Sequence, residues 1–195
     1  MANSLTKFGV PLGGGAGRGG ILMPKLAYRY RVLAVNFGPI GANLDFTQQV
    51  ITIGRPQLEY EEITLNSYNS RSYIHGKHSW SPVSVSLRDD ITNAISTLVG
   101  HQVQKQLNHF EQTKPAAGIN YKFDLRIEIL DGDNDTELEK WDLEGCFIQN
   151  VNYSDLDYSA SDAQTIELTV RFDNATQEDI FERSPVGSEL PGVRS

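Results

Sequence analysis

The stretch WSPVSVSLRDDITNAISTLVGHQVQKQLNHF, residues 80–110, contains the change of hydrophobic period that decides the fold. In its first part Val83, Val85 and Leu87 alternate with polar residues, a pattern typical of a half-buried β-strand. After this strand the apolar residues recur every three or four positions, the spacing of one face of an α-helix. The stretch therefore predicts a strand followed directly by a helix.

The predicted helix covers about residues 90–110. Asp89 and Asp90 stand before it, where a carboxylate can accept free backbone N–H groups and suits the positive end of the helix dipole. The polar side of the helix includes Gln102. Its apolar stripe comprises Ile91, Ala94, Ile95, Leu98, Val99, Val103, Leu107 and Phe110. No other long helical pattern is found, so we expect this stripe to pack on β-strands.

The rest of the chain predicts strands. Residues 28–37 and 45–53 are the first two, and each is followed by glycine and proline. A later strand over residues 138–151 changes phase at Gly145, which predicts a β-bulge. The expected fold class is mainly β: an antiparallel β-barrel or sandwich with one helix packed on it and a long protruding hairpin or arm.

Two strands each combine one apolar face with one polar face. In residues 121–129, four charged side chains alternate with apolar ones, and residues 166–172 alternate in the same way. The outward residues are Lys122, Asp124, Arg126 and Glu128 on the first strand, and Glu167, Thr169 and Arg171 on the second.

Residues 58–80 read as an extended, half-polar segment, either a long hairpin or an arm. Its aromatic side chains have no place in a central core, and exposed aromatic and arginine side chains suit protein contacts. We expect this arm to bind another subunit. The residues predicted to make that contact are Tyr68, Arg71, Tyr73, Ile74 and His75.

The domain organisation follows from the ends of the chain. Residues 1–27 include GGGAGRGG and are expected to form a flexible arm, because no strand precedes the glycines as a dinucleotide-binding loop requires. Residues 28–175 form the β-domain, and residues 176–195 are expected to form a tail.

Composition excludes some function classes. The chain of 195 residues has a formal net charge of −8, which argues against a protein that grips nucleic acid through basic groups. The single cysteine, Cys146, cannot form a disulfide within the chain. We find no signal peptide and no apolar run that would span a membrane, so the default expectation is a soluble protein of a reducing cytoplasm.

Candidate chemistry is sparse. His75 and His78, and His101 and His109, have ligand-like spacings, but zinc needs three or four converging ligands. The acidic segment DGDNDTE, residues 131–137, resembles the start of a calcium loop but lacks the glycine at its sixth position. We therefore predict no catalytic residues, no metal site and no cofactor, with a calcium-binding loop kept as an alternative.

Three segments together resemble the tail tube proteins of contractile bacteriophage tails. They are ITLNSYNSRSYIHGKHSW, residues 63–80; SPVSVSLRDDITNAISTLVGHQVQ, residues 81–104; and LEKWDLEGCFIQNVNYSDLDYSASDAQTIELTVRFDNA, residues 138–175. The resemblance covers roughly residues 28–175.

That resemblance implies a structural virion protein rather than an enzyme. Its subunits would form hexameric rings that stack into the tail tube, assembled in the host cytoplasm. The implied partners are other copies of the chain, the sheath, baseplate and tail-terminator proteins, and viral DNA in transit. The seven outward polar residues would then line the lumen. The alternatives are a type VI secretion or bacteriocin tube subunit, and a β-sandwich module that binds calcium or another ligand.

Overall fold

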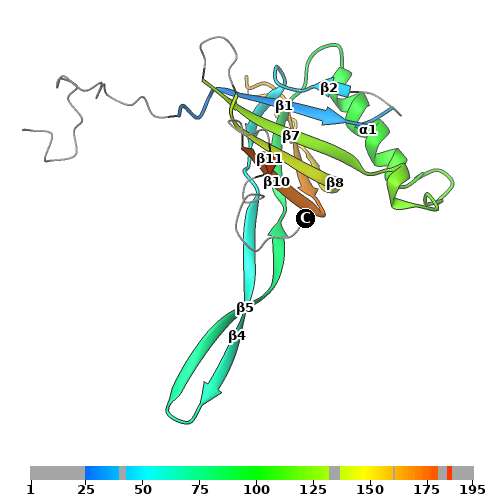
Figure 1. Ribbon diagram of the computed structural model, residues 1–195. Coiled ribbons are helices and arrows are strands. Elements are labelled where there is room, and N and C mark those ends of the chain that lie inside the picture. Colours follow the sequence, from blue (N-terminus) through cyan, green and yellow to red (C-terminus); the bar gives the residue numbers. More distant parts are fainter. Residues whose placement is uncertain (1–24, 40–42, 132–136, 160, 180–183, 186–195) are drawn as a thin grey trace, which may run out of the picture.

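The computed structural model describes residues 25–39, 43–131, 137–159, 161–179 and 184–185 (Figure 1). The predicted glycine-rich arm and the centre of the DGDNDTE segment lie outside the described residues. The elements are β1 (Tyr30–Val35), β2 (Asn43–Asp45), β3 (Val50–Ile53), β4 (Gln57–Ser67), β5 (Ser70–Ser81), β6 (Val83–Arg88), α1 (Ala94–Gln106), a 3₁₀ turn (Gly118–Asn120), β7 (Phe123–Leu130), β8 (Glu137–Tyr153), β9 (Thr165–Arg171), β10 (Asn174–Asp179) and β11 (Ser184–Pro185).

The body is a sandwich whose two halves share the long strand β8. The strands follow the order β2-β1-β7-β8-β9-β6-β3, and β10 pairs with both β8 and β11. Residues 137–146 of β8 pair with β7, whereas residues 147–153 pair with β9. We call β2, β1, β7, β10, β11 and the first part of β8 the first half, and β9, β6, β3 and the rest of β8 the second half. All pairings are antiparallel, and among the described strands the path ends at β2 and β3 without closing into a barrel.

The predicted bulge at Gly145 is confirmed, and it lies where β8 passes from one half to the other. Gly145 has φ +66°, and a Cβ atom there would overlap Oδ2 of Asp173, so this position requires glycine. The Gly145 N–H donates to Oδ1 of Asp124 at 3.0 Å. A sequence change that restored a regular ladder here would remove the bend between the halves.

The core lies between the two halves. Buried side chains from β1 and β7, such as Val32 and Ile127, belong to the same cluster as Val85 of β6 and Leu168 of β9. Because the inner faces of both halves meet in this cluster, their outer faces point away from each other.

Helix α1 is shorter than the predicted helix over residues 90–110. Asn93, which precedes it, has φ +58°, and Leu107 after it is extended at φ −150°. Ile91 and Phe110 therefore lie outside the helix and are exposed, which corrects their assignment to its apolar stripe. The helical spacing of apolar residues extends beyond both ends of α1, so the sequence pattern predicted a longer helix than the backbone forms.

The carboxylates of Asp89 and Asp90 accept backbone N–H groups near the start of the helix, as expected. The residue at the helix boundary itself is Asn93. Oδ1 of Asp90 accepts from the Thr92 N–H at 3.0 Å, and Oδ1 of Asp89 accepts from the Ser96 N–H at 3.4 Å. The bond from Ser96, a residue of the first helical turn, is a helix-capping contact.

The helix closes one side of the sandwich. Ile95 and Val99 enter the core, and Gln102, placed on the polar side in our prediction, is also buried at 0% exposure. Gln102 Oε1 accepts from the Gly38 N–H at 2.9 Å, and its Nε2 donates to the Tyr121 carbonyl at 2.7 Å. A buried polar side chain is stable here because both of its amide groups have backbone partners.

Strand β10 of the body extends past the predicted domain boundary at residue 175. Strand β10 continues to Asp179 and is paired with β8 from Asn174 to Glu178.

None of the described helices is long and apolar enough to cross a membrane.

Candidate assembly surfaces

The seven predicted outward residues lie on two different faces. Lys122, just before β7, and the β7 residues belong to the first half of the sandwich, and the β9 residues belong to the second half. Since the outer faces of the halves point away from each other, the structure does not bring the two groups together.

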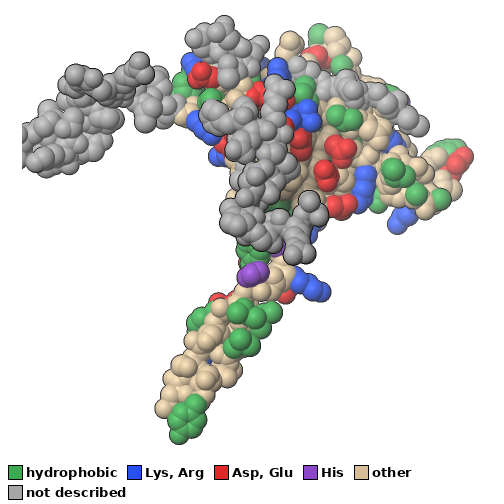
Figure 2. All heavy atoms as spheres, in the orientation of Figure 1, with side chains coloured by type: hydrophobic (Ala, Val, Ile, Leu, Met, Phe, Trp, Pro, Cys, Tyr) green, Lys and Arg blue, Asp and Glu red, His purple; other side chains and the backbone are tan. Residues whose placement is uncertain are grey.

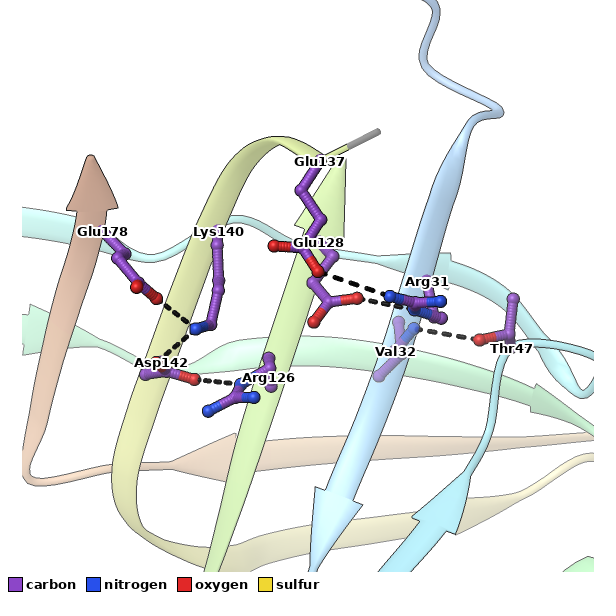
Figure 3. Close-up of polar contacts among 9 residues, drawn as sticks. All are labelled: Arg31, Val32, Thr47, Arg126, Glu128, Glu137, Lys140, Asp142 and Glu178. Atoms are coloured by element: carbon purple, nitrogen blue, oxygen red, sulfur yellow. Dashed lines mark hydrogen bonds and ion pairs between the residues drawn. The ribbon is translucent and has the colours of Figure 1, made fainter. Parts of the chain in front are cut away.

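The outer face of the first half carries a ladder of ion pairs across four strands (Figure 3). Arg31 Nε lies 2.6 Å from Oε2 of Glu128, and Arg126 Nε lies 2.6 Å from Oδ1 of Asp142. Lys140 pairs with Glu178 on β10. Each pair joins residues directly opposite in the β-sheet register, where opposite charges stabilise a sheet.

These charges are largely neutralised in place. Hydrogen bonding to Asp142 raises the pKa of Arg126, and Glu128 is only 2% exposed. The sequence pattern predicted an exposed position for Glu128, and the structure corrects this. Arg31, on the neighbouring strand, supplies the cation that lets this carboxylate be buried.

The outer face of the second half is different. Glu167 is exposed and Arg171 half-exposed, and among the described residues neither belongs to an ion pair within 4 Å. Asn152 Nδ2 donates to Oε2 of Glu167 at the long distance of 3.5 Å. The neighbouring outward residue of β6 is Ser84, directly opposite Thr169. This face is therefore polar but has few interactions of its own.

Both edges of the second half have free pairing positions. Strand β3 pairs only with β6, and the part of β8 beyond Ile148 pairs only with β9. At Ile148 itself the N–H and C=O groups are bonded to the side chain of Gln106, at 2.8 and 2.9 Å. Strand β3 and residues 150–153 of β8 therefore have no second described strand beside them. On β3, the Val50 and Ile51 carbonyls accept from the Tyr30 hydroxyl at 3.1 and 2.9 Å.

The predicted arm is a two-stranded hairpin that projects from the body (Figure 1). Every residue of β4 is exposed. Among the five predicted contact residues, Tyr68 is fully exposed at the turn, and Tyr73 and Ile74 on β5 are also exposed. Arg71 and His75 lie on the same strand and are exposed as well.

Rings along one face of the hairpin connect it to the core. Tyr60 lies 5.8 Å from His75 and 6.3 Å from His78 between ring centroids, and His78 lies 6.5 Å from Trp80. Trp80 packs at 5.7 Å on Phe172, a buried core residue. The base of the hairpin is thereby fixed to the body, while its outer part has no partner in the described chain.

The sequence analysis did not predict the charged cluster around Glu139 of β8. Glu139, 6% exposed, accepts from Lys25 Nζ at 2.8 Å and from Trp141 Nε1 at 2.6 Å, and it also pairs with Arg55. Burial alone would raise the pKa of Glu139, but the bonds from Lys25, Trp141 and Arg55 outweigh it and lower the pKa to about 2. Glu139 lies two positions before Trp141 and four before Leu143 on the same strand, and this alternation could have predicted that it points inward.

The candidate metal ligands are not brought together. Across the described ranges, no group of three or more histidine, cysteine or acidic side chains could hold a metal ion. Cys146 is buried, and this burial raises the pKa of its thiol to about 12, so it is unreactive at neutral pH.

Comparison with known proteins finds similar structures but no similar sequences. No family model matches the sequence, and no curated protein matches it either. A chain in the cryo-EM structure of the PVC sheath–tube complex, an extracellular contractile injection system, aligns with a TM-score of 0.58 at 15% identity, covering 91% of this chain and 99% of that one.

Two further solved structures agree. A chain in the structure of the anti-feeding prophage tube-terminating cap has a TM-score of 0.59 at 13% identity and covers 81% of this chain and 93% of its own. The SPP1 tail tube has a TM-score of 0.52 at 13% identity, with coverages of 79% and 78%. These neighbours are parts of tube assemblies.

The chain therefore has the fold of tail-tube proteins, which confirms the predicted resemblance at the level of the fold. Four of the aligned structures are described as a tail tube or as baseplate, cap and sheath–tube complexes.

Proposed function

We propose that this protein is the subunit of a hollow tube, built from hexameric rings that stack inside the contractile tail of a bacteriophage. The observation that carries the proposal is the combination of a sandwich with unpaired sheet edges and a hairpin whose outer part is exposed on both faces. The likeness over 91% of the chain to a chain of the PVC sheath–tube complex supports it. Its further partners would be the sheath, baseplate and terminator proteins.

Within a ring, the second half would form the channel wall. Its edge strands, β3 and residues 150–153 of β8, each lack a second neighbouring strand in the described structure. Once the Tyr30 hydroxyl leaves the β3 carbonyls, edge-to-edge pairing between neighbours would extend the sheet around a closed circle. Glu167, Thr169 and Arg171 would then face the channel. The first half, with its charges already paired, would face outward.

A channel of this kind suits DNA in transit. Double-stranded DNA carries about one charge per 1.7 Å of its axis, and binding strength grows with the number of phosphates that are neutralised. A wall with alternating acidic, hydroxyl and basic side chains, in a chain of net charge −8, would neutralise few phosphates at once. The DNA would therefore slide rather than bind.

Negative-stain microscopy of the purified protein over a range of concentrations tests the proposal directly. Rings or hollow rods are the expected result. A chain that stays monomeric at every concentration would contradict it, and heat release on titration with calcium would favour the alternative of a ligand-binding β-sandwich.

Cysteine labelling of assembled rods tests which face lines the channel. Ser84→Cys lies on the outer face of the second half and Val35→Cys on that of the first, while the native Cys146 is buried and stays silent. A bulky maleimide should modify Val35→Cys and spare Ser84→Cys in rods, and modify both in dissociated protein. The opposite protection pattern in rods would reverse the assignment of the two faces.

The hairpin would act as the assembly arm. Replacing residues 61–79 by a short turn should leave a folded body that no longer polymerises, because the removed residues are exposed and contribute little to the core. Circular dichroism would check the fold and microscopy the assembly. Normal tubes formed by the shortened chain would disprove this role.

A type VI secretion or bacteriocin tube remains the alternative within the same fold. A secretion tube passes proteins rather than a genome, so recovery of the protein in particles that contain DNA would separate the two.

A further inference from the structure

Exposed apolar side chains gather in two places: on the hairpin, which continues from one end of the second half, and on the connection between β8 and β9 at its other end. The hairpin joins β6 at Val83, whereas β6 ends at Arg88, which pairs with Thr165 at the start of β9. Tyr153 ends β8 at the same place. The described residues of the connection, 154–159 and 161–164, therefore lie at the end of the body that is farthest from the hairpin.

Large apolar side chains are exposed at this far end. We call it the distal surface and define its apolar part as Ile91, Tyr153, Leu156 and Tyr158. A shallow pocket beside them is lined by Leu156, Tyr153 and residues at the start of α1. Nothing within the described residues covers these side chains.

The distal surface is also acidic. Among the described residues of this surface, the carboxylates are Asp89, Asp90, Asp155, Asp157 and Asp162, and the one cation is Arg88. Hydrogen bonds from Thr92 lower the pKa of Asp90, and those from Ser159 lower the pKa of Asp157, so both are charged at neutral pH.

The outer part of the hairpin has the complementary character. Residues 63–74 contain one charged side chain, Arg71, and no carboxylate. Figure 2 shows hydrophobic side chains gathered on this outer part. The exposed apolar residues there are Ile63, Leu65, Tyr68, Tyr73 and Ile74.

We propose that the outer part of the hairpin of one copy docks on the distal surface of a second copy, stacked head to tail. Both surfaces are apolar, their charges are opposite, and they face opposite ends of one molecule. A contact between two different surfaces of the same chain repeats without closing, so it builds a stack. This inference rests on the proposed function, and it names the receiving surface for the arm.

The length of the hairpin fits such a contact between layers. Strand β4 has 11 residues, which at the rise of a β-strand gives a reach of about 35 Å. That is on the order of the diameter of a small domain, so the hairpin of one layer can reach across to the next.

Charge reversal tests the pairing of Arg71 with the acidic surface. Arg71→Asp and Asp155→Arg should each raise the protein concentration needed for rod formation by roughly tenfold, and the double variant should restore it. Both positions are exposed, so the fold should be unaffected. Lys77→Asp makes the same charge change near the base of the hairpin and should have little effect. If the folded double variant assembles no better than the single ones, the pairing is wrong.

Removing the apolar contact separates this inference from the function itself. Leu156→Ala with Tyr158→Ala should leave hexameric rings that fail to stack, as seen by microscopy and native mass spectrometry. Rods from the altered protein at the wild-type concentration would overturn the docking site but leave the tube proposal standing. Wild-type protein that forms no rings or rods would overturn both.

Discussion

The body and the hairpin are both antiparallel β-structure, yet they bury their side chains very differently. In β6 the exposure alternates strictly, with Val83, Val85 and Leu87 buried, whereas all 11 residues of β4 are exposed. Both regions have antiparallel backbone ladders with occasional bulges. An isolated two-stranded hairpin is marginally stable in water, so the exposed side chains of this one add little to the stability of the fold.

The strongest way to break this comparison is the same substitution made in both regions. Leu143 of β8 is fully buried and lies directly opposite Leu125 on β7. Leu143→Ala should lower the free energy of unfolding by about 2–5 kcal/mol, because it removes transfer energy and leaves a cavity. Leu65→Ala, on the exposed hairpin, should change it by less than about 0.5 kcal/mol. Urea unfolding measures both.

Similar losses for the two leucine variants would contradict the comparison. They would mean that the hairpin folds back onto the body in solution and shares its core.

A second pair sharpens the comparison for polar side chains. Gln102→Ala should destabilise the body by about 2 kcal/mol, because it leaves the Gly38 N–H and the Tyr121 carbonyl without their partner in or near the core. Gln57→Ala, at an exposed position of the hairpin, should cost less than about 0.5 kcal/mol. Thermal unfolding followed by circular dichroism would rank the two, and an equal cost would show that Gln102 is accessible to water.

Sequence patterns predicted the elements of this fold better than their arrangement. The alternation in β6, β7 and β9, the bulge at Gly145 and the projecting hairpin all follow from local spacing and glycine stereochemistry. Period two reveals that a strand has two faces, but it does not reveal which sheet the strand joins. The outward residues of β7 and β9 therefore read as one surface in the sequence and lie on two in the structure.

Buried polar groups were the other limit of prediction. Gln102 lies seven positions after Ile95 and three after Val99, on the apolar side of the helix, but its polarity suggested exposure. Its burial depends on backbone groups at Gly38 and Tyr121, which are far away in sequence. Glu128 and Glu139 were misjudged or missed for the same reason, since Arg31, Lys25 and Arg55 come from distant segments.

The smallest effect is expected from charge, and it depends on pH. Glu139 has a pKa of about 2 in the folded chain, against an ordinary value of 4.5. A lowered pKa in the folded state stabilises the protein above the unfolded value, and this contribution is lost as the pH falls from about 4.5 towards 2. Because Lys25 and Arg55 are more than half exposed, we expect about 1–2 kcal/mol rather than the full value of the shift.

Glu139→Gln should therefore unfold more easily than the wild-type chain at pH 7 and equally easily near pH 2, as measured by urea unfolding at several pH values. Glu62→Gln makes the same change on the hairpin, where Glu62 is exposed and its carboxylate accepts from the Thr64 hydroxyl at 3.3 Å. The unfolding curve of this variant should follow the wild type throughout. A pH-independent difference for Glu139→Gln would mean that the carboxylate contributes through packing alone. In that case the contrast between body and hairpin would rest on burial, with no part played by charge.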